Sequence, residues 1–198
     1  QLHAQTLQPK EVLVVNEQPK SNNKDITYRY RTGYDYFRNK DFDVIALMED
    51  DEYYAPNYLE TIVSEWINQN KPDLFGTTYT IYYHIKYFAK FTMHHHQRSS
   101  AMSTLIKPDL NFKWCPDYEP FTDVHLFNTL PYKLFTPKKI ICIGIKHGVG
   151  LTGGNSHMCD KRRYVNGDDS NKEWLKQNTT KESFEFFSNY FDVKIDKN

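Results

Sequence analysis

The sequence predicts an α/β domain in which helices flank a mixed, mostly parallel central sheet. Short apolar runs at residues 11–15 and 43–48 are bounded by polar and turn residues, which is typical of buried strands. The second run is apolar throughout after its first residue, as expected for a strand covered on both faces. A helical pattern follows it at residues 59–67. Strands that alternate with helices indicate an α/β fold with a parallel sheet.

The composition indicates one globular domain that spans residues 1–198. Hydrophobic residues make up 39% of the chain and charged residues 25%, which excludes a disordered chain. The 25 basic side chains balance the 25 acidic ones, and nucleic-acid-binding domains normally carry a basic excess. We therefore expect no nucleic-acid partner. No apolar run approaches the ~20 residues of a transmembrane helix, so no such helix is expected.

The cysteines favour a reducing compartment. Cys115, Cys142 and Cys159 are far apart in the sequence and odd in number. A disulfide framework or a zinc ribbon requires closer, paired cysteines, so we expect free thiols. The first residues lack the basic and apolar regions of a signal peptide. These features predict a soluble, cytoplasmic domain.

The helix at residues 59–67 is the most clearly patterned element. Its apolar stripe consists of Leu59, Ile62, Val63, Trp66 and Ile67. These positions are three or four residues apart and so share one helix face. Pro56 and Asn57 supply the start of the helix, with Asn57 as its candidate cap.

The second half of the chain predicts further strands and two short helices. Residues 77–83 and 139–145 are β-branched or aromatic and favour strands, and the stretch up to residue 106 favours a hairpin-like arrangement. A short helix is expected at residues 123–130, with Val124, Phe127 and Leu130 on one face. Residues 148–155 form a glycine-rich loop.

The last helix is expected at residues 181–191. Thr179 and Glu182 have the spacing of a capping box at its start. The stripe of this helix consists of Phe184, Phe187 and Phe191.

Four consecutive acidic residues follow the second predicted strand. Glu49, Asp50, Asp51 and Glu52 repel one another at the end of a buried strand, and a cation offsets this cost. Alternate residues face the same way, so Glu49 with Asp51, or Asp50 with Glu52, would converge on one ion. Oxygen ligands favour Mg²⁺ or Mn²⁺. The alternative is an exposed acidic turn at the start of the next helix, where carboxylates gain from the helix dipole.

This acidic run and its surroundings resemble a known enzyme family. Residues 43–60, an apolar strand followed by Glu49-Asp50-Asp51-Glu52, aromatic residues, a proline and a Leu-Glu helix start, look like the DXD region of family-2-type glycosyltransferases of the GT-A fold. Residues 5–17 resemble the second strand of that family and the loop that receives the nucleotide base. The texture rich in Tyr, Asn and Lys also resembles glycosyltransferase domains of large algal (chlorella) viruses.

The resemblance implies a set of donor-binding residues. Asp51 matches the metal-binding acid of the family, and Asp50 beside it contacts the ribose or the metal. Glu49 fills the first position of the DXD triplet, where the family more often has Asp. Asn16 stands where the family usually has an Asp that hydrogen-bonds the base, and an amide can still read a uracil edge. Arg31 lies in the segment that carries donor contacts in the family, or else is a surface arginine.

The resemblance also implies a catalytic base and further ligands. Asp123 matches the Asp that deprotonates the acceptor hydroxyl in inverting members, with a helix N-cap as the alternative role. Thr122 replaces the acid that precedes this Asp in the family. His147 after the strand at residues 139–145 is a candidate further metal ligand, with His157 second. Lys146 is a candidate to neutralise the diphosphate, together with three basic residues at positions 161–163.

The predicted function is therefore metal-dependent glycosyl transfer. The resemblance implies a nucleotide-sugar donor, most readily a UDP-sugar, Mn²⁺ or Mg²⁺, hexosyl or deoxyhexosyl transfer, and a glycan or glycoprotein acceptor. Two alternatives stay open: a non-catalytic nucleotide- or glycan-binding module, and a metal-dependent phosphohydrolase. The family begins with a strand that has no match here, so we expect that the native protein has further residues, with further domains as an open alternative.

Overall fold

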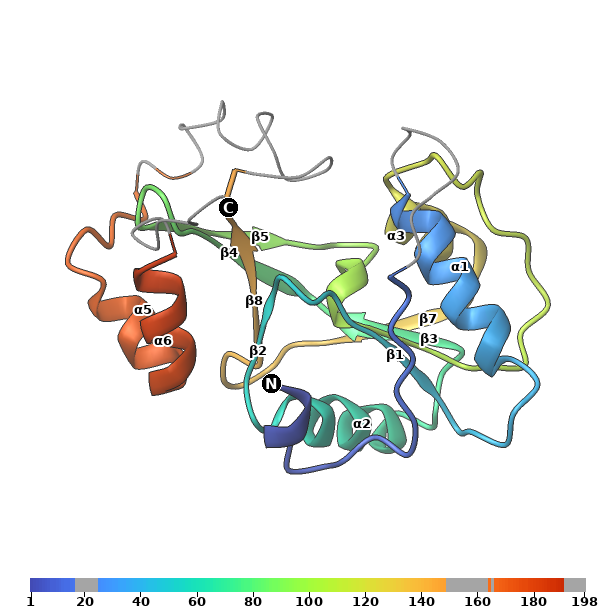
Figure 1. Cartoon of the computed structure of the whole chain (residues 1–198). Coiled ribbons are helices and arrows are strands. Elements are labelled where there is room, and N and C mark those ends of the chain that lie inside the picture. Colours follow the sequence, from blue (N-terminus) through green and yellow to red (C-terminus); the bar gives the residue numbers. More distant parts are fainter. Residues whose placement is uncertain (17–24, 149–163, 165, 191–198) are drawn as a thin grey trace, which may run out of the picture.

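The structure is a computed structural model that describes residues 1–16, 25–148, 164 and 166–190. These residues form two four-stranded sheets with helices packed against them (Figure 1). The helices are η1 (Leu2–Ala4), α1 (Ile26–Phe37), α2 (Tyr58–Asn68), η2 (Ala101–Ser103), α3 (Thr122–Thr129), α5 (Glu173–Asn178) and α6 (Lys181–Ser188). The strands are β1 (Ile45–Leu47), β2 (Tyr53–Tyr54), β3 (Leu74–Thr77), β4 (Tyr79–His84), β5 (Ala89–His94), β6 (Thr104–Ile106), β7 (Tyr132–Phe135) and β8 (Cys142–Lys146).

The strand order is β1-β6-β3-β7 in the first sheet and β2-β8-β4-β5 in the second. In the first sheet β6 runs antiparallel to both of its neighbours, and β3 pairs with β7 in parallel. In the second sheet β8 pairs antiparallel with β2 and parallel with β4, and β4 forms an antiparallel hairpin with β5.

The prediction of one mostly parallel, Rossmann-like sheet of the GT-A type is wrong. The described strands form two separate mixed sheets, and antiparallel pairings predominate in them. An apolar run indicates a strand but does not encode its direction. Only a helical crossover between strands favours parallel pairing, whereas β4 and β5 are joined directly by a short turn.

Three apolar clusters hold these elements together. One packs α2 against β3, β6 and Tyr54 of β2. The second packs α1 and α3 against β1 and the opposite side of the same sheet. The third packs α5 and α6 against β4 and β8. Helices therefore cover both faces around β1, and α5 and α6 lie at the far end of the molecule (Figure 1).

Several predicted elements are present with changed bounds. The helix predicted at residues 59–67 is α2, and Leu59, Ile62 and Trp66 of its stripe are buried as expected. The strand predicted at residues 43–48 is shorter, and the one at residues 139–145 begins and ends later. Asn57 precedes α2 but makes no side-chain cap.

The strand predicted at residues 11–15 does not form. The segment makes no main-chain hydrogen bond to residues 44–48, although both segments are described. Val12 is 50% exposed and Val14 69% exposed. A β-branched apolar run needs a partner edge to become a strand, and residues 11–15 hydrogen-bond to no strand in the described part of the chain.

The apolar pattern of the sequence did not predict α1, and it predicted the wrong buried face for α3. The chain around α1 carried no helical prediction, because the buried face of α1 consists of Thr27, Tyr30 and Tyr34 rather than aliphatic residues. In α3, Leu126 and Phe127 are buried, whereas Val124 is 36% exposed, so the predicted stripe is rotated.

The last helix differs at both ends. In α6 the side chain of Thr180, not Thr179, accepts the capping hydrogen bond. The helix ends at Ser188, and residues 191–198 lie outside the described residues. All but the first residue of the predicted glycine-rich loop also lie outside them, as do His157 and residues 161–163. None of the helices in the described part of the chain is long and apolar enough to cross a membrane.

Candidate functional site

The four acidic residues 49–52, here called the acidic loop, connect the two sheets. β1 precedes the loop and belongs to the first sheet, and β2 follows it and belongs to the second. One carboxylate oxygen each from Glu49, Asp51 and Glu52 lies within 4.8 Å of the other two. The chain leaves its strand geometry after Leu47, so these three side chains converge, whereas strict alternation would pair only Glu49 with Asp51.

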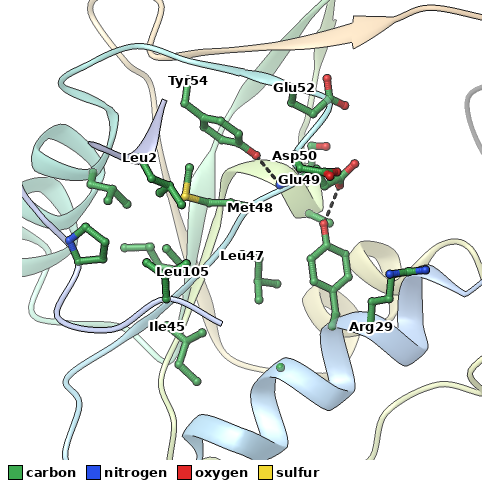
Figure 2. A pocket seen from close by; sticks show the side chains of 18 of the residues that line it. Leu2, Arg29, Ile45, Leu47, Met48, Glu49, Asp50, Glu52, Tyr54 and Leu105 are labelled. Atoms are coloured by element: carbon green, nitrogen blue, oxygen red, sulfur yellow. Dashed lines mark hydrogen bonds between the residues drawn. The ribbon is translucent and has the colours of Figure 1, made fainter. Parts of the chain in front are cut away.

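Two tyrosines from different elements hold Glu49. The Tyr30 hydroxyl of α1 donates to Glu49 Oε1 at 2.6 Å. The Glu49 amide donates to the Tyr54 hydroxyl at 2.8 Å (Figure 2). The same hydroxyl donates to the carbonyl of Met102. Burial raises the pKa of Glu49, while its hydrogen bond from Tyr30 and the charge of Lys146 oppose the rise.

Glu52 is buried against the end of β8. Its side chain is 3% exposed and accepts a hydrogen bond from the amide of Ile145. The ammonium of Lys146 lies 3.4 Å from Glu52 Oε1. Burial raises the pKa of Glu52 to about 8, although Lys146 and the Ile145 amide oppose the shift. The negative charges of Glu49 and Asp51 raise the pKa of Glu52 further.

Asp51 and His147 meet at the open side of the acidic loop. His147 Nε2 lies 3.2 Å from Asp51 Oδ2. The side chain of Asp51 is 52% exposed and that of His147 18% exposed. Asp50 is exposed as well and lines the same cleft. The structure therefore brings the predicted residues Glu49, Asp51, Lys146 and His147 together.

The acidic loop lines a cleft of about 1720 Å³ that also contains Asp123 and Arg98. Asp123 lies in the first turn of α3, and its carboxylate forms an ion pair with the guanidinium of Arg98. Burial raises the pKa of Asp123, and the Arg98 charge opposes the rise. Phe121 is the N-cap residue of α3 and Asp123 is the second residue of the helix, so Asp123 is not at the N-cap position.

The two remaining predicted donor contacts have different positions. Asn16 is exposed and lines the cleft. Arg31 is not among the residues that line it, and its guanidinium forms two hydrogen bonds with Asp117 at 2.9 and 2.8 Å. The structure therefore does not bring Arg31 to the acidic loop.

The donor set fits a hard divalent cation. Glu49, Asp51 and Glu52 supply only carboxylate oxygens, which Mg²⁺ and Mn²⁺ prefer. Glu52 is buried and Glu49 is partly buried, and burial favours the protonated forms of both, so a bound cation offsets the cost of ionising them. His147 adds a nitrogen beside Asp51 that suits Mn²⁺ better than Mg²⁺.

Sequence reasoning missed the contacts that Tyr30, Tyr54 and Arg98 make at this site. It paired Glu52 with Asp50 as candidate ligands, whereas the structure groups Glu52 with Glu49 and Asp51, which depends on the turn between β1 and β2. Tyr30, Tyr54 and Arg98 carry no local signal, because each reaches the site through the packing of distant segments.

No protein-family model matches this chain, and no curated protein matches it significantly.

Proposed function

We propose that this protein is a metal-dependent glycosyltransferase that moves a sugar from a nucleotide diphosphate donor, a UDP-sugar, to a hydroxyl of a glycan or glycoprotein acceptor. The observation that carries the proposal is the convergence of three carboxylates on one side of a large cleft that also holds Asp123. The resemblance of residues 43–60 to the DXD region of nucleotide-sugar glycosyltransferases supports the same chemistry.

The acidic loop is the donor end of the cleft in this proposal. Glu49, Asp51 and Glu52, with His147 beside Asp51, would hold Mn²⁺ or Mg²⁺, which as a Lewis acid neutralises the charge of a diphosphate leaving group. Lys146 supplies a second positive charge within the same cleft.

Asp50 and Asn16 are the further donor contacts. Both are exposed and line the cleft, with Asp50 next to the metal ligands. Asp50 accepts hydrogen bonds from the ribose hydroxyls, and the Asn16 amide both donates to and accepts from the base.

Asp123 is the base at the acceptor end. Its carboxylate takes the proton of the acceptor hydroxyl as that oxygen attacks the sugar, and the diphosphate leaves with the electron pair of the broken bond. Burial raises the pKa of Asp123, which makes it a stronger base than an exposed aspartate. Arg98 fixes the orientation of the carboxylate through their ion pair.

The same ion pair favours a second candidate, a nucleotide- or glycan-binding module without turnover. A carboxylate engaged by a guanidinium is a weaker base than a free one. In such a module Asp123 and Arg98 would bind ligand hydroxyls, and no bond would be broken.

A comparison of binding with turnover tests the proposal. We would incubate the protein with a panel of UDP-sugars, Mn²⁺ and a mixture of oligosaccharide acceptors, and measure UDP release and glycan mass. Asp123→Asn is expected to retain Mn²⁺-dependent UDP binding and to lose transfer by about 100-fold or more, in the range of general-base catalysis.

Two results would contradict this function. UDP binding without transfer to any acceptor, unaffected by Asp123→Asn, would favour the binding module. Release of inorganic phosphate from UDP without an acceptor would favour a phosphohydrolase.

A further inference from the structure

β1 has an unpaired edge in an unusually buried position. It is the first strand in the order of its sheet, and β6 is its only strand neighbour among the described residues. Ile45 and Leu47 pack into the cluster with α1, while Ala46 packs towards α2. Helices thus cover both faces of β1, which is typical of an interior strand. Edge strands with apolar faces are normally paired or covered along the edge as well.

The unpaired edge faces a part of the cleft that we call the apolar arm. It is lined by residues 12–15 and 44–47, by Gly33, Tyr34 and Phe37 of α1, and by Leu59, Val63 and Trp66 of α2. The acidic loop lies at the end of this arm, directly after Met48, and Figure 2 shows Ile45, Leu47 and Leu105 leading towards it.

The opposite wall of the apolar arm is itself an extended apolar segment without a strand partner. Residues 12–15 are Val-Leu-Val-Val, and no main-chain hydrogen bond joins residues 11–15 to residues 44–48, both of which are described. The guanidinium of Arg29, which also lines the cleft, donates to the carbonyl of Val15 at 2.6 Å. Main chain therefore borders the arm on two sides.

The arm is an open part of the cleft with mostly apolar walls. Native cores pack to the density of organic crystals, with few spaces larger than a water molecule. Water in the arm would contact mostly aliphatic and aromatic walls. The main-chain groups on the open edge of β1 also need partners, because burial without hydrogen bonds is costly.

We propose that the apolar arm is the docking site for an added β-strand, supplied by an apolar segment of a partner protein. The segment is apolar on both faces, because α1 and α2 cover it from opposite sides. It hydrogen-bonds to the outer edge of β1, at the usual strand spacing of about 4.8 Å. The unpaired edge distinguishes a peptide strand from a lipid or an aromatic small molecule, since neither supplies a row of donors and acceptors.

This proposal is independent of the proposed chemistry. It rests on the pairing and burial of β1, and it holds whether or not the acidic loop binds a metal. A docked strand would also order the chain immediately before Glu49.

Hydrogen exchange with a model peptide tests the docking site. The probe is an eight-residue peptide with Val and Ile at its six central positions and Lys at both ends. The control peptide has the same side chains but a methyl group on every amide nitrogen, so it donates no main-chain hydrogen bond. We expect the outward-facing amides of residues 44–48 to exchange at least about tenfold more slowly with the probe and unchanged with the control.

A pair of variants locates the binding. Gly33 lines the apolar arm and a β-carbon there would lie 3.7 Å from Val15, so Gly33→Trp would fill the arm. Asp35, on the same helix, is exposed and does not line the cleft, so Asp35→Trp is the matched control. We expect Gly33→Trp, but not Asp35→Trp, to abolish the protection, with circular dichroism to verify that both variants are folded.

Three outcomes would overturn the proposal. Equal protection by the methylated peptide would indicate an apolar small-molecule site rather than strand addition. Unchanged exchange at residues 44–48 would show that the edge does not accept a strand. Protection without peptide that grows with protein concentration, with a dimer in sedimentation, would identify a second copy of this chain as the occupant.

Discussion

Burial and charge act in opposite directions on the carboxylates of the acidic loop. Burial raises the pKa of both Glu49 and Glu52, and neighbouring carboxylates add to the rise. Lys146 is the cation nearest to Glu52 among the described residues, at 3.4 Å. One buried ammonium faces several carboxylates, so the site is short of positive charge. This imbalance is the physical reason to expect a divalent cation there.

His95 provides a test of residue-level electrostatics away from the acidic loop. It is 6% exposed, and its Nε2 lies 2.9 Å from the hydroxyl of Thr80. Burial lowers its pKa to about 4, and the charge of Arg98 adds to the effect. The unfolded chain therefore binds a proton below pH ~6.5 that the folded protein binds only near pH 4.

The free energy of unfolding should consequently fall between pH 6.5 and 4, and His95 should contribute up to about 3 kcal/mol of that fall. Urea denaturation at pH 7 and at pH 4.5 measures it. His95→Asn should remove the contribution, whereas His96→Asn, at an exposed position, should retain it. The same loss of stability on acidification in both variants would refute the assignment.

At the scale of elements, the sequence predicted best where a single pattern dominates. The aliphatic stripe of α2 located that helix because Leu59, Ile62 and Trp66 are buried by the helix itself packing on a sheet. α1 escaped prediction because tyrosines form its buried face. The run at residues 11–15 was misleading, since strand formation depends on a partner edge that local sequence does not contain.

In the site too, residues that are close in the sequence could be predicted, whereas contacts between distant segments could not. Glu49 and Asp51 could be predicted because they are close in the sequence and follow an apolar strand. The contact between Glu52 and Ile145 spans 93 residues, and the contact between Arg98 and Asp123 joins the segment after β5 to α3. Such contacts depend on sheet topology, which was the part of the fold that the sequence pattern predicted wrongly.

The start of α6 supplies a prediction at the scale of one element. The Ser183 amide donates to the Thr180 hydroxyl at 3.3 Å, and that hydroxyl also contacts the hydroxyl of Ser183. Thr180→Ala should lower the free energy of unfolding by about 1 kcal/mol, as measured by thermal or urea denaturation. Thr180→Ser keeps the capping oxygen and should lose much less. A loss in Thr180→Ser as large as in Thr180→Ala would mean that the cap does not stabilise α6.

At the scale of the whole molecule, the acidic loop connects two sheets that also share an apolar cluster, in which Tyr54 of β2 packs with residues of β3 and β6. β1 belongs to the first sheet and β2 to the second, and Glu52 contacts the end of β8. Glu49 is held by α1 through Tyr30 and by β2 through Tyr54. A cation bound by Glu49, Asp51 and Glu52 would therefore link the two sheets, and the donor would bind in the cleft that the acidic loop lines.

The most direct test of this account is whether the acidic loop makes nucleotide diphosphate binding depend on a divalent cation. Calorimetric titration of UDP, with and without Mn²⁺, measures this for the wild-type protein, for Asp51→Asn and for Asp109→Asn. Asp109 is exposed and does not line the cleft, so its variant is the matched control. We expect Mn²⁺ to tighten UDP binding at least about tenfold in the wild type and in Asp109→Asn, and to have no effect in Asp51→Asn. Mn²⁺-dependent binding of equal strength in Asp51→Asn would contradict the account.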